Sequence, residues 1–221
     1  MIFYKVMKKI LNILLSVLVL SSYVVGYDIL KLKEDLKNPK ASVRLSVIRE
    51  VAVNLDEELV DVLIEHLQEE TDNFVKCEIL ETISLIKSSD VFNVLKIYTK
   101  DKNEVVRQVA ISKVVEFINF DIVDVLNEVI TSDNSTQIKK VAIYALKDFK
   151  KEKTVKILDE FIKDEKNEKE LRLLALTTLA KIGDEKSLEV LKKYSLHKDK
   201  EIRDVANKEL ADFKKDKNKK R

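Results

Sequence analysis

A chain of 221 residues is long enough for one domain with a sizeable core or for one short array of stacked repeats. Hydrophobic residues make up 45% of the chain and charged residues 36%, with only two glycines and one proline, a composition that excludes a disordered chain and favours helices joined by short polar links. The formal net charge of +2 is too small to indicate a nucleic-acid-binding protein.

The N-terminal segment, residues 1–26, has the order of regions found in a secretory signal peptide. Its first nine residues carry three lysines and no acid, an apolar run of eleven residues (ILNILLSVLVL) follows, and SSYVVG ends in a small residue. We expect cleavage between Gly26 and Tyr27 and export to the periplasm or cell envelope of a bacterial-type cell. The alternative is an uncleaved membrane anchor, but Ile10 to Val25 gives only 16 residues against the roughly 20 that span a bilayer.

The rest of the chain is close to neutral but unevenly charged. Without the three N-terminal lysines the formal net charge is −1, and the C-terminal tail, residues 214–221 (KKDKNKKR), holds a net charge of +5. Residues 27–213 therefore carry a net charge of −6, which argues against nucleic acid as a partner. The tail could be attracted weakly to an anionic membrane, at about 1 kcal/mol per basic residue, and the alternative is a frayed, solvated end.

One amphipathic phrase recurs six times along residues 27–213. Each copy has apolar residues at positions 0, 4 and 8, and the second to sixth copies also at position 11, the spacing of one face of an α-helix. The last four copies carry alanine at position 4, which would let neighbouring helices approach closely. The copies begin 31–33 residues apart, at Val43, Val75, Val106, Ile138, Leu171 and Ile202.

A second, shorter helical phrase precedes each of these copies, so each unit reads as a helical hairpin. The links within hairpins are polar, as in TSDNST, and the segments between hairpins, such as KSSD and GDEK, offer Ser and Asp to cap the next helix. One hairpin cannot bury both of its apolar faces, so we predict an all-α fold, an α-solenoid of about six stacked hairpins. The shorter phrases are anchored on Leu32, Leu63, Leu95, Leu126, Leu158 and Leu191.

A charged pattern accompanies the apolar one. The residue after each start is basic, and an acidic residue often lies shortly before it. Together with alanine and leucine four and eight positions on, this pattern resembles the HEAT repeat family, in its short variety of phycobilisome-lyase type. Tetratricopeptide repeats are similar in length, but their tryptophan-containing signature is missing. The basic residues are Arg44, Lys76, Arg107, Lys139, Arg172 and Arg203.

The resemblance implies a structural role for these charged residues. In HEAT repeats the turn aspartate and the helix arginine form a ladder between adjacent repeats. By that resemblance Asp101 is expected to pair with Arg107, and Asp133 with Lys139. The likeness covers nearly all of the chain after the N-terminal segment, and it departs from the family pattern at residues 38–39, where Asn and Pro replace the acidic turn.

Catalytic, metal-binding and cofactor-binding patterns are missing from the sequence. His66 and His197 are the only histidines and would lie far apart in a linear array, and the sequence has no Gly-rich phosphate loop. The single cysteine, Cys77, cannot form an internal disulfide and is expected to pack as a small apolar side chain. We therefore expect no enzyme activity and no cofactor.

What remains is a surface on which another protein or peptide could bind. In HEAT-like solenoids the second helices line the concave side, and there Tyr144, with Lys140 and Lys147 one turn away, has the character of an interface anchor. We predict a monomeric scaffold for protein–protein interactions; the alternatives are an accessory, lyase-like role on an enzyme or cofactor, and binding to nucleic acid. The candidate contact residues are Glu81, Gln108, Ser112, Lys140, Tyr144, Lys147 and Thr177.

Overall fold

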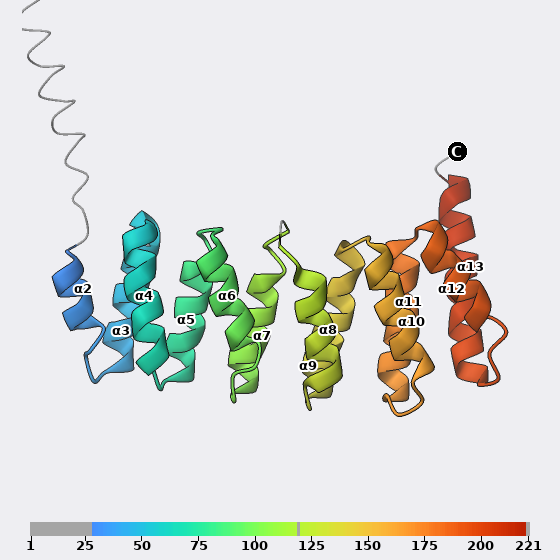
Figure 1. The fold of residues 1–221 in the computed structure, drawn as a ribbon, viewed down its shortest axis with the longest axis horizontal. Coiled ribbons are helices and arrows are strands. Elements are labelled where there is room, and N and C mark those ends of the chain that lie inside the picture. Colours follow the sequence, from blue (N-terminus) through green and yellow to red (C-terminus); the bar gives the residue numbers. More distant parts are fainter. Residues whose placement is uncertain (1–27, 119, 220–221) are drawn as a thin grey trace, which may run out of the picture.

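The computed structural model describes residues 28–118 and 120–219, and within these ranges the chain is helical and contains no strand. The helices follow one another as six antiparallel hairpins arranged side by side (Figure 1). This arrangement confirms the predicted all-α solenoid. The first helices of the hairpins are α2 (Ile29–Asp35), α4 (Glu57–Glu69), α6 (Ser89–Tyr98), α8 (Ile122–Ser132), α10 (Glu152–Lys163) and α12 (Glu185–Tyr194).

The second helices lie next to one another in a separate layer. Two of them are extended by short 3₁₀ helices, η1 (Ala52–Asn54) and η2 (Leu146–Asp148). Neighbouring second helices contact one another more extensively than neighbouring first helices do, as expected for the inner side of a curved array. The second helices are α3 (Ala41–Val51), α5 (Asn73–Ile83), α7 (Glu104–Val114), α9 (Thr136–Ala145), α11 (Lys169–Ile182) and α13 (Lys200–Lys219).

Short polar residues begin the helices where the sequence indicated. The Ser88 hydroxyl accepts a hydrogen bond from the backbone N–H of Val91 at 3.2 Å, and the Asp184 carboxylate accepts from the N–H of Ser187 at 2.7 Å. Each bond satisfies a donor that the first turn of a helix leaves free. Gly183 ends α11 in the left-handed region at φ 66°, where a side chain would be strained and its Cβ would lie 3.3 Å from the ring of Phe213.

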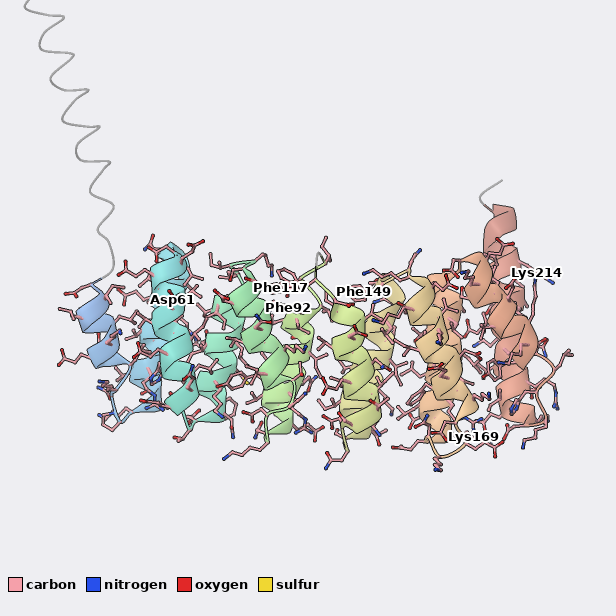
Figure 2. All side chains as sticks on the ribbon, in the orientation of Figure 1. Asp61, Phe92, Phe117, Phe149, Lys169 and Lys214 are labelled. Atoms are coloured by element: carbon pink, nitrogen blue, oxygen red, sulfur yellow. The ribbon has the colours of Figure 1, made fainter. Side chains whose placement is uncertain are left out.

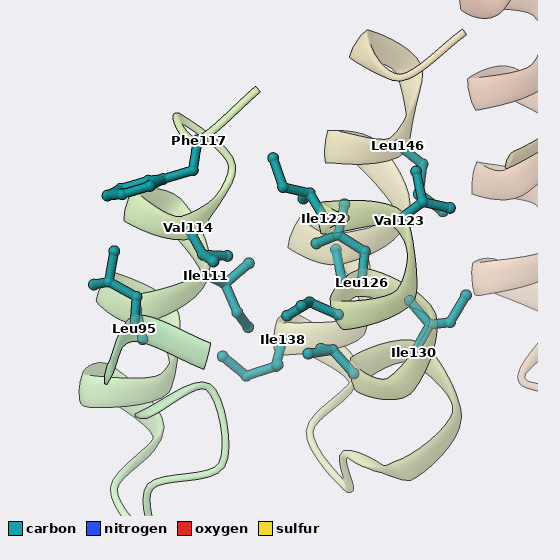
Figure 3. Packing of buried hydrophobic residues seen from close by; sticks show 14 of the residues in the cluster. Leu95, Ile111, Val114, Phe117, Ile122, Val123, Leu126, Ile130, Ile138 and Leu146 are labelled. Atoms are coloured by element: carbon teal, nitrogen blue, oxygen red, sulfur yellow. The ribbon is translucent and has the colours of Figure 1, made fainter. Parts of the chain in front are cut away.

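The buried core runs without interruption from hairpin to hairpin. All six leucines that anchor the first helices are buried, and so are the residues at position 4 of all six second-helix copies. Figure 3 shows how the buried side chains of the third and fourth hairpins pack. At positions 0 and 8 of the second-helix copies, Val43 and Leu210 are only partly buried, because the first and last hairpins have a neighbour on one side only.

An aromatic cluster covers the core at the link between α7 and α8. The ring of Phe92 stacks on that of Phe120 at a centroid distance of 4.6 Å, and the ring of Phe117 lies 6.0 Å from Phe92 (Figure 2). The link in which Phe117 and Phe120 lie is longer than the other links between hairpins. Aromatic side chains thus cover the core at the longest link between hairpins.

Several predictions about the two ends of the chain concern residues that the structure describes only in part. The expected signal peptide, residues 1–26, lies outside the described residues. The helix α13 continues to Lys219, so the expected boundary between solenoid and tail at residue 213 falls inside a helix. Among the helices within residues 28–118 and 120–219, none is both long and apolar enough to cross a membrane.

Candidate functional site

In the first three hairpins the basic residue of the second helix forms an ion pair with an acid of the next hairpin and not with one of its own turn. Lys76 Nζ lies 3.0 Å from Asp101 Oδ2, and Arg107 Nε lies 2.7 Å from Asp133 Oδ2. The expected pairing of Asp101 with Arg107 is therefore wrong. The Asp133 carboxylate faces Arg107 and not Lys139, so that expected pair is wrong too. The Asp101 carboxylate pairs with Lys76, and Arg107 contacts its own turn by donating from Nη1 to the carbonyl oxygens of Asp101, at 3.0 Å, and Lys102, at 3.3 Å.

Three of these contacts, which we call the turn-edge ion pairs, join the first four hairpins. In each pair the acid follows the base by 25 or 26 residues along the chain. The acidic side chains are between 2% and 8% exposed, so the charges attract each other in a region of low dielectric. The two arginines bind their carboxylates through both Nε and Nη2, a two-point geometry that fixes the relative position of neighbouring hairpins. The pairs are Arg44–Glu70, Lys76–Asp101 and Arg107–Asp133.

Glu70 is at the centre of the most extensive of these contacts. Its carboxylate accepts hydrogen bonds from Arg44 at 2.7 and 2.9 Å. It also contacts His66 Nε2 at 2.9 Å and accepts from the backbone N–H groups of Thr71 and Asp72. Burial alone would raise the pKa of Glu70. The hydrogen bonds to the ionised carboxylate and the charge of Arg44 outweigh that effect and lower the pKa to about 2. Glu70 is therefore ionised throughout the physiological range.

The later hairpins do not continue the pattern. Lys139 is half-buried and forms no ion pair within the described part of the chain. Arg172 is 7% exposed, and its Nε donates to the carbonyl oxygen of Ile162 at 2.7 Å. Arg203, in the last hairpin, donates from Nη1 to the carbonyl oxygen of His197 at 2.6 Å. Among the described residues, the basic residue at this repeat position thus forms an ion pair only at the three junctions between the first four hairpins.

The seven candidate contact residues lie along four neighbouring second helices and η2, on what we call the second-helix surface. Some of them already link hairpins: Lys140 Nζ lies 2.6 Å from Glu170 Oε1, and Thr177 Oγ1 donates to Glu209 at 3.1 Å. These two are therefore less free to contact a partner. Glu81, Gln108, Ser112 and Tyr144 are exposed, and Lys140, Lys147 and Thr177 are half-buried.

Tyr144 is an exposed aromatic residue of this surface. The residue is 44% exposed, and the Nζ atoms of Lys147 and Lys181 lie 4.1 and 5.5 Å from its ring centroid. Each ammonium group is attracted to the negative face of the ring and helps to hold it in place. Lys140, the other neighbour expected from the sequence, pairs with Glu170 instead. The contact with Lys181 was not predicted, because Lys181 belongs to the next hairpin. Only a comparison of the fourth and fifth copies, aligned side by side, could have indicated it.

A row of aliphatic side chains crosses the same surface beside Tyr144. The residues at position 3 of the last four second-helix copies are apolar and half-buried, and they pack against the edge of the core. This apolar row was not predicted from the sequence, although the residues recur at a fixed position of the repeat. Apolar groups next to an exposed aromatic residue with polar neighbours are typical of protein-binding surfaces. The row consists of Val109, Val141, Leu174 and Val205.

Many exposed charges elsewhere are paired between neighbouring hairpins. On the second helices Arg49 binds Glu78 through two hydrogen bonds of 2.9 Å, and on the first helices Lys193 binds Asp159 at 2.9 Å. Figure 2 shows charged side chains along both edges of the array. Exposed pairs of this kind contribute little to stability because water screens them, so they chiefly set the register of the hairpins.

The titratable residues that the structure describes do not gather into a metal site or a reactive cluster. His66 contacts Glu70 in the second hairpin. His197 lies four hairpins away from His66, and its Nδ1 accepts a hydrogen bond from the backbone N–H of Asp199. Within residues 28–118 and 120–219 there is no group of three or more His, Cys, Asp or Glu that could hold a metal ion. Burial, and then the nearby carboxylates, raise the pKa of Cys77, so its thiol stays protonated and weakly reactive.

A family comparison agrees with the geometry. A sequence model of HEAT repeats matches residues 29–114 and 123–211, and the chain therefore belongs to the HEAT repeat family. The break between the two matched segments falls at the long link that carries the aromatic cluster. No curated protein sequence matches the chain significantly.

Solved structures show the same fold at low sequence identity. Escherichia coli YibA is 22% identical over 81% of this chain and 66% of its own, with a TM-score of 0.50. A structure from work on TOG–tubulin binding specificity is 14% identical over 81% of this chain and 80% of its own, with a TM-score of 0.51. Human deoxyhypusine hydroxylase is 14% identical over 84% of each chain, with a TM-score of 0.44. The likenesses to YibA and to the structure from the TOG–tubulin work support the solenoid fold alone.

Proposed function

We propose that this protein is a non-catalytic scaffold that binds another protein or peptide on its second-helix surface. The observation that carries the proposal is the exposed ring of Tyr144, held between Lys147 and Lys181 at the edge of the apolar row. An aromatic side chain whose position is already restricted loses little conformational entropy on binding. The half-buried aliphatic groups beside it would lose their remaining contact with water in a complex.

The charges at this surface indicate what a partner would present. Two ammonium groups face one aromatic ring, and Lys181 forms no ion pair among the residues that the structure describes. A partner with apolar side chains and at least one acidic side chain would complement the apolar row and Lys181 together. HEAT repeat proteins commonly bind other proteins, which fits this role.

Affinity capture with residues 27–221 tests the proposal. We expect the wild type to retain specific proteins from a cell-envelope extract, and we expect the double variant Tyr144→Ala, Lys147→Glu to lose most of them. Truncation of a central anchor typically costs about 2 kcal/mol or more, roughly a thirtyfold loss of affinity. The matched control is Lys163→Glu, an exposed charge reversal on α10, which should retain the same proteins as the wild type. Equal recovery by the wild type and the double variant would rule out this binding surface.

We also propose that the mature protein acts as a monomer in the periplasm or cell envelope. The basis for the location is the order of basic, apolar and small residues in residues 1–26. N-terminal sequencing of the protein isolated from cells is expected to begin at Tyr27. A chain that still begins at Met1 would mean that the segment is retained.

A further inference from the structure

Exposed apolar side chains gather on the second helices of the first three hairpins, where α5 packs between α3 and α7 (Figure 1). Phe74, in the first turn of α5, is 75% exposed, and Leu85, just after the end of α5, is 60% exposed. The neighbouring helices add Val53, in η1, and Val105, in the first turn of α7. We call these four residues the α5 patch. A cluster of large apolar side chains on one face of a protein typically marks a site of contact.

The repeat places the four side chains of the α5 patch on one face. Phe74 lies one residue before the start of its second-helix copy and Leu85 ten residues after it, and the two valines occupy the same positions in the neighbouring copies. The eleven residues between these positions are close to three helical turns, so both positions face one side of a second helix, about 16 Å apart. That side is the second-helix surface, because Lys181, at the repeat position of Leu85, contacts the ring of Tyr144 there.

An acidic side chain lies between the two ends of the α5 patch. Glu81 is exposed on α5, four residues before Leu85, and it forms no ion pair within the residues that the structure describes. Burial, and then the charges of Glu81 and other carboxylates, raise the pKa of Cys77, one turn before Glu81, so the local potential is negative. The bases of α3, α5 and α7 already contact other carboxylates. These contacts are Arg44–Glu70, Arg49–Glu78, Lys76–Asp101, Arg107–Asp133 and Lys113–Glu116.

A helix of another polypeptide fits this arrangement. Two apolar ends about 16 Å apart match side chains three turns apart on one face of a helix, and a lysine or arginine between them would face Glu81. This charge preference is opposite to that at Tyr144, where Lys181 favours an acidic side chain. The two halves of the second-helix surface therefore favour different partner sequences.

We propose that the α5 patch is a docking site for an amphipathic helix of another protein, one that carries large apolar side chains about three turns apart and a basic side chain between them. Burial of Phe74 and Leu85 supplies the affinity, and pairing with Glu81 fixes the position of the helix along α5. The site goes beyond the function proposed above, because Tyr144, Lys147 and Lys181 take no part in it. Either site can be lost while the other is kept.

Titration of the full chain with two helical peptides tests the α5 patch. Both peptides are about 18 residues long, or five helical turns, with blocked ends and with leucine along one face. One peptide carries lysine at the remaining positions and the other carries glutamate. We expect the wild type to bind the lysine peptide at least tenfold more tightly than the glutamate peptide, because Glu81 attracts the first and repels the second.

Removal of the two apolar ends is expected to weaken this binding. The double variant Phe74→Ser, Leu85→Ser should lower the affinity for the lysine peptide at least tenfold. The matched control is Leu30→Ser, Ile97→Ser, which removes two comparably exposed apolar side chains from the first helices α2 and α6. That control should change the affinity less than threefold. Equal affinity of the wild type and the Phe74→Ser, Leu85→Ser variant would overturn the proposal, and so would equal losses in the two double variants.

A change of charge separates recognition from general adhesion of an apolar peptide. Glu81→Lys should reduce the preference for the lysine peptide over the glutamate peptide at least tenfold. Glu58→Lys makes the same change at an exposed position of α4 and should leave that preference within threefold of the wild type. Equal effects of the two substitutions would contradict a role for Glu81. A wild type that self-associates and binds neither peptide would also overturn the proposal, because a second copy of the chain would then occupy the patch.

Discussion

Replacing Leu146 by alanine is expected to lower the free energy of unfolding by about 2–5 kcal/mol, the usual cost of removing a large aliphatic side chain from a packed core. Leu146 is completely buried in η2, which packs against α11 of the next hairpin (Figure 3). The substitution leaves a cavity between two hairpins that neither can fill alone. Chemical denaturation of the wild type and the variant measures the effect.

The cost at Leu146 has a second consequence in a stacked array. Each hairpin contacts only its neighbours, so stability depends on every junction along the chain. A cavity at the junction of the fourth and fifth hairpins should weaken the coupling between the two halves, and the denaturant dependence of unfolding should become shallower. Lys150→Ala, at an exposed position near η2, is the control and should change stability by less than about 0.5 kcal/mol. A denaturation midpoint unchanged in Leu146→Ala would mean that this residue is not in the core.

The hairpins could be predicted well from the sequence, because the periodicity of apolar residues dominates the burial of a helix. An apolar residue every three or four positions must face a neighbour, so the positions that recur in six copies identify the buried face without knowledge of the partner helix. The leucine anchors of the first helices are all buried, as that rule requires. The rule weakens where a hairpin has only one neighbour, and there Val43 and Leu210 stay partly exposed.

The charged residues could not be predicted in the same way, because their pairing depends on direction. The repeat pattern places a base and an acid in every unit, but it does not say whether Arg107 turns back to Asp101 or forward to Asp133. The structure shows the forward direction, since the first turn of α7 points the side chain toward the next hairpin. For the same reason the contact of Lys181 with Tyr144, which joins two hairpins, is not evident from either copy alone.

Replacing Glu70 by glutamine is expected to destabilise the protein by about 3–5 kcal/mol at neutral pH, because it leaves the buried charge of Arg44 without its counterion. Glu70 is the most buried acid of the turn-edge ion pairs, with a side chain 2% exposed. Glutamine keeps nearly the same shape, so the loss reports the charge and not a cavity. Glu65→Gln is the matched control: Glu65 pairs with Lys33 at 2.8 Å on the surface, and its side chain is 70% exposed. That control should lower the free energy of unfolding far less than Glu70→Gln does, because water screens an exposed pair.

The dependence of stability on pH distinguishes this explanation from a simple loss of packing. The pKa of Glu70 is about 2 in the folded protein, against an ordinary value of 4.5, so the folded state binds the proton less readily than the unfolded state does. The stabilisation is therefore fully present above about pH 4.5 and is lost as the pH falls from there toward 2. The denaturation midpoint of the wild type should fall through this window, and the curve for Glu70→Gln should be flatter there and approach that of the wild type at its acid end. Parallel curves for the two proteins would contradict the assignment, because the midpoint difference would then owe nothing to the ionised Glu70 carboxylate.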